Sequence, residues 1–178
     1  MPLPVERAAK SREVALLGIF VAYALVISLI ERMIPLSFSI PGLRLGLANV
    51  VVLIAMYLFP LSRALLLMLL KCLLAALFAG SPAALFYSLG GSLLSFAIMA
   101  ALIRLFREHI SPVGVSVAGA ALHNIGQILV ACLLIRSWIV LLYLPVLLLI
   151  GIGTGAAIGV LVLKLRPTLE TYLRTRKD

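Results

Sequence analysis

Residues 64–80 read ALLLMLLKCLLAALFAG, an apolar run that contains a single charged side chain, Lys71. A helix needs roughly 17 to 25 mainly apolar residues to cross the hydrocarbon core of a bilayer, and this run is long enough to do so. The rest of the 178-residue chain has the same character: 64% of its residues are hydrophobic, 12% are charged, and the mean hydropathy is +1.25. This composition is far from that of soluble domains and predicts an integral membrane protein.

Similar apolar runs recur along the sequence and predict an all-α, polytopic membrane helical bundle of about six transmembrane helices. The expected spans are 14–30, 46–59, 64–80, 84–103, 114–135 and 139–163. The second span is short and the last is long, which burial among neighbours or tilting can accommodate. A β-barrel is disfavoured because the apolar residues run continuously instead of alternating. We expect one integral membrane domain over residues 1–178, with short basic cytoplasmic ends at 1–13 and 164–178.

The Lys and Arg residues lie mostly on one side of this predicted bundle. With the N-terminus inside, the inner ends of the spans carry Arg7, Lys10, Arg12, Arg63, Arg104, Arg107, Lys164, Arg166, Arg174, Arg176 and Lys177. The outer side carries only Arg32, Arg44 and Arg136. Because cytoplasmic flanks accumulate basic residues, we expect a multi-pass protein of the cytoplasmic membrane with both termini in the cytoplasm. The net charge of +9 then reflects topology and contact with anionic membrane lipid, and we expect no nucleic-acid partner.

Polar side chains within the spans are costly in lipid, so each needs a partner, a water-filled cavity or a function. Lys71 lies near the midpoint of its span, about 12 Å from either end, which is too deep for easy snorkelling. His123, Asn124 and Gln127 lie together on a later span, and helical spacing places them on one face. We expect these four side chains to face the interior of the bundle.

More polar residues fall in the outer halves of the spans once the chain is threaded in this orientation. They are Glu31, Arg44, Asn49, Tyr87 and Ser88. A cavity open to the outside explains this one-sided distribution. Because the charges there are mainly positive, an anionic ligand such as a phosphate or carboxylate is favoured. Tyr87, with Tyr23 and Phe86, offers aromatic surface for a planar ligand.

A purely structural role stays open for each of these polar residues taken singly. Lys71 could pair with Glu31, and His123 could be a satisfied core imidazole. Asn124 and Gln127 could be hydrogen-bonding groups that join helices, with a modest contribution of about 0.6 kcal/mol.

Three strings of residues resemble a known family. They are PGLRLGLAN at 41–49, SLGGS at 88–92, and GVSVAG at 114–119 leading into HNIGQ at 123–127. Together they resemble the Gx transporter family, which is labelled heptaprenyl diphosphate synthase component I, over residues 31 to about 159. In size and helix count that family is similar to the S components of energy-coupling factor vitamin transporters. Its relatives are implicated in moving flavin, notably FMN, across the membrane for extracytoplasmic flavoproteins.

The resemblance implies an S-component-like bundle in the cytoplasmic membrane of a prokaryote. It implies solute contacts from Arg44, Asn49, Lys71, His123, Asn124 and Gln127. S components dock on a coupling subunit through paired alanines at four-residue spacing in their first helix, whereas here the pair is Gly18 and Ala22. Energising transporter subunits, where used, would dock near these two residues.

The sequence argues against an enzyme. Prenyl diphosphate synthases hold Mg²⁺ with clustered carboxylates, because this hard cation prefers oxygen ligands. The acidic residues are scattered, with no aspartate-rich motif, at Glu6, Glu13, Glu31, Glu108, Glu170 and Asp178. A glycine-rich phosphate loop is also missing, and Cys72 and Cys132 have no metal-ligand spacing. We therefore expect no catalytic residues, no metal and no cofactor.

The leading hypothesis is a transport protein that binds an anionic, partly aromatic solute, FMN first among them, in the outer half of the bundle and moves it across the cytoplasmic membrane. The alternative is a non-catalytic membrane partner of isoprenoid (prenyl diphosphate) biosynthesis or of a redox complex.

Overall fold

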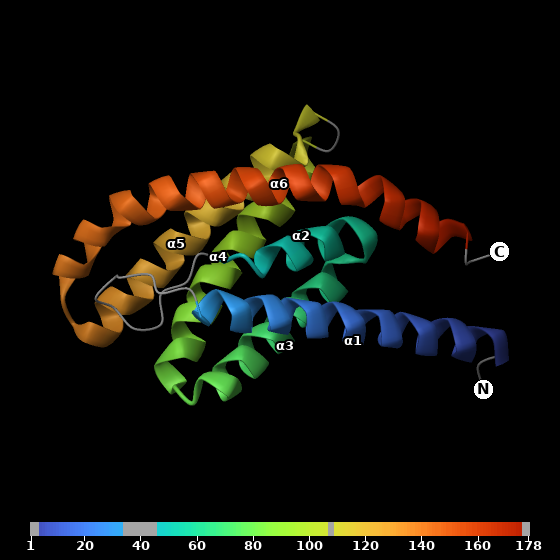
Figure 1. Cartoon of the computed structure of the whole chain (residues 1–178), viewed down its shortest axis with the longest axis horizontal. Coiled ribbons are helices and arrows are strands. Elements are labelled where there is room, and N and C mark those ends of the chain that lie inside the picture. The colour runs from blue at the N-terminus through green and yellow to red at the C-terminus, as the bar shows by residue number, and fades with distance from the viewer. Residues whose placement is uncertain (1–3, 34–45, 107–108, 176–178) are drawn as a thin grey trace.

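The computed structural model describes the backbone of residues 4–33, 46–106 and 109–175 and the side chains of residues 11–33, 46–106 and 109–172. These residues form helices only, which confirms the all-α prediction for this part of the chain. In order they are α1 (Pro4–Met33), α2 (Asn49–Leu58), α3 (Leu61–Ala79), α4 (Pro82–Phe106), α5 (Pro112–Ile135), a 3-10 helix η2 (Trp138–Tyr143) and α6 (Leu144–Thr175), as Figure 1 shows.

Five helical segments are long and apolar enough to cross a membrane. They are Ser11–Met33, Leu61–Ala79, Pro82–Phe106, Pro112–Ile135 and Trp138–Tyr172. The predicted span 46–59 contains only α2, whose 10 residues extend about 15 Å, roughly half the thickness of a hydrocarbon core. Five of the six predicted spans therefore contain helices long and apolar enough to cross a membrane, and the count of six is not confirmed, because α2 alone is too short to span the hydrocarbon core.

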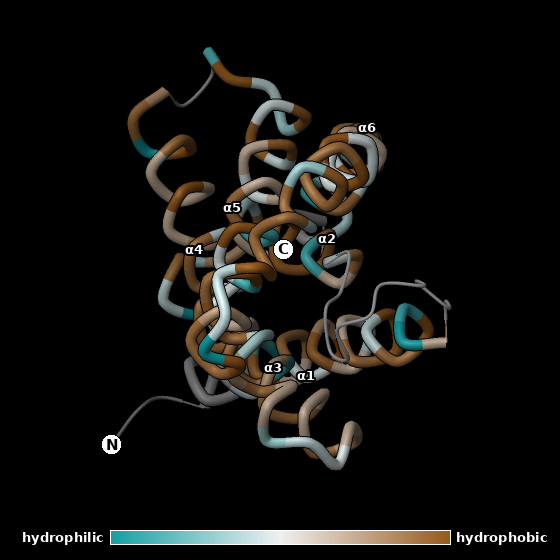
Figure 2. Tube along the Cα trace, turned by 90° about the vertical axis from the view of Figure 1, so that its left-hand side faces the viewer, coloured by the Kyte–Doolittle hydropathy of each residue, from teal (hydrophilic) through white to brown (hydrophobic). Residues whose placement is uncertain are grey.

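The short helix α2 lies at the centre of the bundle. Around it, α1 packs on α3, α3 on α4, α4 on α5, and α5 on α6, while α2 itself contacts α1, α3, α4 and α6. Figure 2 looks along the bundle and shows α2 between α6 and the α1–α3 pair. Every residue from Asn49 to Met56 is buried. A helix enclosed in this way can be apolar on all sides, as α2 is except at Asn49.

Local sequence signals account for several helix ends. Gly80 ends α3 in the left-handed conformation, with φ of 62°, and Pro82 starts α4 two residues later. Ser111 caps α5, since its Oγ accepts a hydrogen bond from the Gly114 N–H at 3.2 Å, and Pro112 occupies the first helical position. Short connections of this kind place α4 beside both α3 and α5.

Small residues allow α5 to approach both of its neighbours closely. A Cβ on Gly126 would strike the carbonyl of Gly90 in α4. On the other side, a Cβ on Gly155 of α6 would lie 3.0 Å from the Cα of Val117. Close backbone approach of this kind is how helices associate in lipid, where apolar burial gives little driving force.

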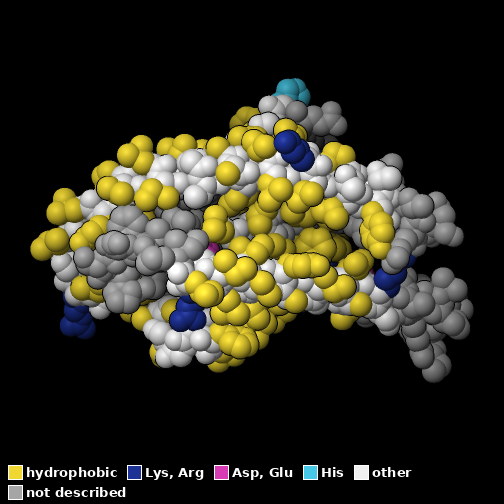
Figure 3. Space-filling model, viewed as in Figure 1, with side chains coloured by type: hydrophobic (Ala, Val, Ile, Leu, Met, Phe, Trp, Pro, Cys, Tyr) yellow, Lys and Arg dark blue, Asp and Glu magenta, His cyan; other side chains and the backbone are white. Residues whose placement is uncertain are grey.

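The outer surface of the bundle is largely apolar. Leu133, Leu142 and Leu149 are 69–77% exposed, and at most half of each spanning window is buried inside the chain. Figure 3 shows hydrophobic side chains across most of one face. Water would be a poor solvent for such a surface, whereas a bilayer matches it.

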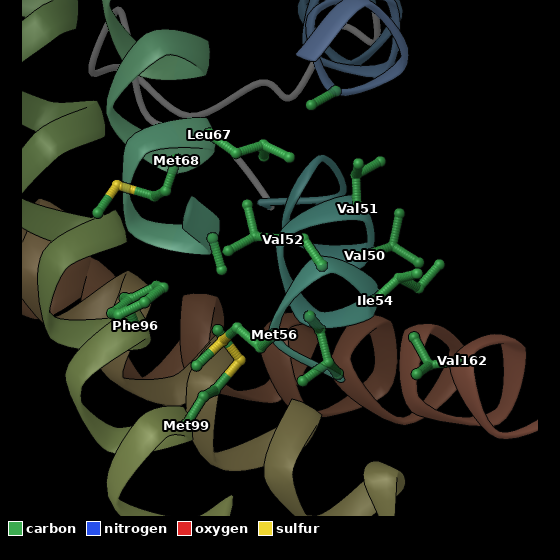
Figure 4. Close-up of a cluster of buried hydrophobic side chains, with 14 of the residues drawn as sticks. Val50, Val51, Val52, Ile54, Met56, Leu67, Met68, Phe96, Met99 and Val162 are labelled. Carbon is green, nitrogen blue, oxygen red and sulfur yellow. The ribbon is translucent and has the colours of Figure 1, made fainter. Parts of the chain in front are cut away.

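An apolar core surrounds the middle and the C-terminal half of α2. Its buried members include Val52, Leu53 and Met56 of α2, Leu67 and Met68 of α3, Phe96 and Met99 of α4, and Val162 of α6. Figure 4 shows these helices contributing side chains to one cluster. Asn49, at the start of α2, and its hydrogen-bond partner Lys71 lie beyond this core.

Candidate functional site

Lys71 is a buried basic side chain near the middle of α3. Its side chain is 3% exposed, and its Nζ donates hydrogen bonds to Asn49 Oδ1 at 3.1 Å and to Ser92 Oγ at 3.4 Å. Both acceptors are neutral, and within the described part of the chain no carboxylate forms an ion pair with this ammonium. A buried ammonium without a counter-charge is costly, so this position favours the arrival of an anion.

The two acceptors come from different helices. Asn49 is the first residue of α2, and Ser92 lies in the middle of α4, so Lys71 joins three helices at one point. Sequence reasoning did not select Ser92 as a site residue. Its spacing of four residues from Ser88 was the available signal, since residues i and i+4 share a helix face.

Ser88 is connected to Ser92 through the thiol of Cys72. Its Oγ donates to Cys72 Sγ at 3.3 Å, and Cys72 Sγ lies 3.4 Å from Ser92 Oγ as a donor to it. Cys72 is fully buried and directly follows Lys71 in the sequence. It therefore belongs to the polar contacts of α3 and α4, a role that its apolar sequence context did not suggest.

His123 and Gln127 lie against each other on α5. Their Nε2 atoms are 2.7 Å apart, and both side chains are at most 2% exposed. This distance is that of a hydrogen bond between the Gln127 amide and the His123 ring. The two residues are one helical turn apart, as the sequence spacing predicted.

Two glycines make room for the His123 ring. A Cβ on Gly46 would lie 2.9 Å from both His123 Cδ2 and Asn49 Nδ2. A Cβ on Gly91 of α4 would lie 2.9 Å from His123 Cε1. The imidazole therefore sits between the segment that enters α2 and the middle of α4, which connects it to the Lys71 contacts through Asn49.

Glu31, near the end of α1, binds the backbone that enters α2. Its carboxylate accepts hydrogen bonds from the Gly46 N–H at 2.6 Å and the Leu47 N–H at 3.1 Å, and its side chain is 3% exposed. Ala48 provides no side-chain cap for α2, so this carboxylate supplies an acceptor and a negative charge at the helix N-terminus. These two hydrogen bonds are to the backbone that leads into α2, while Lys71 bonds to Asn49 and Ser92.

The structure gathers most of the predicted site residues into one group. We call it the polar cluster and define it as Glu31, Asn49, Lys71, Ser92, His123 and Gln127, contributed by α1 to α5. All six side chains are buried, so the cluster is closed in this conformation. Arg44 lies outside the described residues.

Asn124 lies apart from this cluster. Its Nδ2 donates to the Leu147 carbonyl of α6 at 2.6 Å, and a Cβ on Gly151 of α6 would strike the same nitrogen. We expected Asn124 to lie on the same helix face as His123 and Gln127, but its hydrogen bond is to a different neighbour. Successive helical residues point about 100° apart, and here that step turns Asn124 toward α6, where it joins two helices.

Of the three predicted aromatic residues, only Tyr87 faces inward. It is 6% exposed and packs in a second apolar cluster with Ile128 of α5 and Leu147 of α6. Tyr23 is 63% exposed and Phe86 is 53% exposed, so both point out of the bundle. Of these three aromatic side chains, only Tyr87 could contact a molecule held inside the bundle.

Within the described residues, no group of three His, Cys, Asp or Glu side chains could hold a metal ion. The site is instead built from one ammonium, one carboxylate, one imidazole and neutral hydrogen-bonding groups. Such a set can donate hydrogen bonds to, and accept them from, a charged or polar organic molecule.

These features define a multi-pass α-helical membrane protein with a buried polar cluster at the start of its central helix. The chain belongs to the heptaprenyl diphosphate synthase component I family, whose sequence profile matches residues 20–165 and confirms the resemblance. No curated protein and no solved structure matches the chain.

Proposed function

We propose that this chain is a membrane transport protein that binds an anionic, partly aromatic solute in the polar cluster and moves it across the cytoplasmic membrane. The observation that carries the proposal is the Lys71 ammonium, 3% exposed, with two neutral acceptors. A charged side chain in the membrane interior costs several kcal/mol unless a partner or water stabilises it. An anionic group beside Lys71 would supply the missing counter-charge and a strong hydrogen bond.

FMN is the first solute to test. Its phosphate carries about two negative charges at neutral pH and offers three acceptor oxygens to Lys71 and Asn49. Its planar ring needs apolar and aromatic surface, which Tyr87 and the neighbouring apolar cluster provide. The resemblance to a family with flavin-transporting relatives supports the same choice.

Transport requires the closed cluster to open alternately toward each side. Asn49, Lys71 and His123 sit on three different helices, so a relative movement of α2, α3 and α5 would change the binding geometry directly. We propose that the solute binds from the outer side. The site is then exposed to the inner side either by rocking of the helices or by movement of the S-component-like bundle within an energising complex. Such subunits would dock on α1 near Gly18 and Ala22, which are both exposed.

The orientation of the chain is part of the proposal. With both termini in the cytoplasm, the start of α2 faces the outer half of the membrane, and the α2–α3 turn faces the cytoplasm. A reporter that is active only in the cytoplasm should be active when it is fused to either terminus. Activity of a terminal fusion outside the cell would contradict this orientation.

A second function has one observation in its favour, namely the family's own description. On this alternative the chain is a non-catalytic membrane partner in prenyl diphosphate synthesis, and the polar cluster fixes helix packing. Lys71 would then hold α2, α3 and α4 together without any solute.

A ligand panel on the purified protein in lipid nanodiscs separates these functions. We expect FMN to bind about tenfold or more tightly than riboflavin, which lacks the phosphate; a tenfold ratio corresponds to about 1.4 kcal/mol. Heptaprenyl diphosphate is the competing ligand. Binding of the prenyl diphosphate without FMN, or co-purification of a stoichiometric synthase without flavin affinity, would favour the second function. Failure of all three ligands to bind would remove the solute assignment.

A further inference from the structure

The turn between α2 and α3 is held from two sides at the end of the bundle opposite the polar cluster. On one side, Glu13 of α1 forms an ion pair with Arg63 of α3. Also from α1, the ring of Phe20 packs edge-on against Phe59 in the turn, with centroids 5.5 Å apart and planes at 88°. The two contacts tie α1 to the turn.

On the other side, α6 holds the end of α2. The Arg166 guanidinium lies over the Tyr57 ring, 4.5 Å from its centroid, and Arg166 Nε donates to Glu170 Oε1 at 2.6 Å. A cation above an aromatic face is attracted to it, and the neighbouring carboxylate keeps the guanidinium in place. We call the Glu13–Arg63 and Arg166–Tyr57 contacts the inner latch.

An apolar layer separates the inner latch from the polar cluster. Arg63 precedes Lys71 by eight residues in α3, and Tyr57 follows Asn49 by eight residues in α2, so each separation is about 12 Å along the helix. The buried side chains between them include Met56, Leu67, Met68, Phe96 and Met99. Figure 4 shows these residues around α2. Three of them are methionines, whose flexible side chains repack readily.

We propose that α2, the apolar layer and the inner latch form the inner gate of a transport path, which closes the polar cluster off from the cytoplasmic side. This inference rests on the proposed transport function. The layer excludes water and solute, and the latch fixes the α2–α3 turn between α1 and α6. Partly exposed ion pairs and cation–π contacts are weak, and weak contacts can break in every transport cycle.

Thiol labelling from the cytoplasmic side tests the gate. A Met56→Cys variant places a thiol in the apolar layer, and a membrane-impermeant maleimide is added to inside-out membrane vesicles. With the latch intact we expect slow labelling. Adding Glu13→Gln and Arg166→Gln should raise the labelling rate about fivefold or more, because losing about 1 kcal/mol shifts an open–closed equilibrium by that factor.

Matched variants control for charge and folding. The charge-swapped pair Glu13→Arg and Arg63→Glu should restore slow labelling. Arg104→Gln removes an exposed cation from the end of α4 and should leave the rate unchanged. The same latch variants with Met56 retained report on folding, since Cys132 is 3% exposed and lies in the second apolar cluster. If Cys132 becomes labelled in the double variant, the labelling rate of Met56→Cys is compared in the single Arg166→Gln variant instead.

An unchanged Met56→Cys labelling rate in the latch variants would overturn the inner gate. So would an equal rise in the Arg104→Gln control. Because the labelling needs no solute, this result leaves the solute assignment standing. Conversely, the latch variants could label faster while the protein binds none of FMN, riboflavin and heptaprenyl diphosphate. That result would support the inner gate and contradict the proposed solute.

Discussion

Lys71 Nζ lies 3.1 Å from Asn49 Oδ1, which joins the middle of α3 to the first residue of the central helix α2. A neutral amide thus faces a buried ammonium. The amide satisfies one donor of the ammonium without cancelling its charge. The charge therefore remains available to an anion, and this relationship leads to the first prediction.

Asn49→Asp should supply the counter-charge internally. A carboxylate in this position would pair with Lys71 and repel a phosphate, as close charges of the same sign do at recognition sites. We expect FMN affinity to fall about tenfold or more and riboflavin affinity to change by less than about threefold. Fluorescence titration of both flavins measures the ratio. An equal loss for both would show that the substitution acts through packing and not through charge.

Glu31→Gln should weaken the start of α2. The carboxylate accepts hydrogen bonds from the Gly46 and Leu47 N–H groups, and hydrogen bonds to charged groups contribute about 1.5–3 kcal/mol each. A neutral amide retains part of this, so we expect a loss of stability of about 1–3 kcal/mol. Thermal unfolding followed with a thiol-reactive dye is suitable, because Cys72 and Cys132 are both buried.

The control for that measurement is Glu170→Gln. Glu170 is 42% exposed and pairs with Arg166 one turn away, and pairs of this kind contribute about 0.5 kcal/mol or less. Its substitution should leave unfolding nearly unchanged. If Glu170→Gln destabilised the protein as much as Glu31→Gln, the proposed capping role of Glu31 would be wrong.

Gly91→Ala should separate α4 from α5. The new Cβ would lie 2.8 Å from the His123 carbonyl oxygen and 2.9 Å from His123 Cε1, and the backbone oxygen cannot move aside cheaply. Overpacking of this kind costs about 1–3 kcal/mol. Gly153→Ala in α6 is the matched control, because nothing lies within 4 Å of its Cβ position. It should be neutral or stabilise the helix by up to about 1 kcal/mol, and equal losses in both variants would refute the close approach at Gly91.

The sequence predicted most of the fold because span length and apolar character are local properties. The predicted spans coincide with α1 and α3 to α6, yet their ends differ. The last span was expected to end at residue 163, but α6 continues through Pro167 to Thr175. Apolar character marks where the bilayer ends, whereas a helix continues for as long as its backbone hydrogen bonds allow.

Side-chain partners were harder to predict than helices. Burial of Lys71 follows from its position in the span, and the His123–Gln127 contact follows from helical spacing. The contact of Asn124 with α6 depends on which helix lies beside it, and that is a tertiary property. The same holds for the contact between Cys72 and Ser92.

Docking of an energising subunit on α1 gives a further prediction. Gly18 is exposed and a Cβ there meets nothing within 4 Å, so Gly18→Leu should leave folding and flavin binding intact. If a partner helix packs closely on this face, the larger side chain should reduce co-purification of the partner subunits about tenfold. Gly153→Leu, on α6, serves as the comparison. Equal recovery of partner subunits with both variants would exclude this face of α1 as the docking site.

The central claim is that the buried charge of Lys71 recognises an anion, and the FMN affinity of a Lys71→Met variant tests it most directly. Methionine is also unbranched and is only one heavy atom shorter, and it lacks the ammonium. We predict that FMN affinity falls about 30-fold or more, because truncating one partner of a buried charge pair costs about 2–5 kcal/mol, while Lys164→Met on the exposed surface of α6 binds as the parent does. A Lys71→Met protein that folds and binds FMN with the parent's affinity would contradict the account.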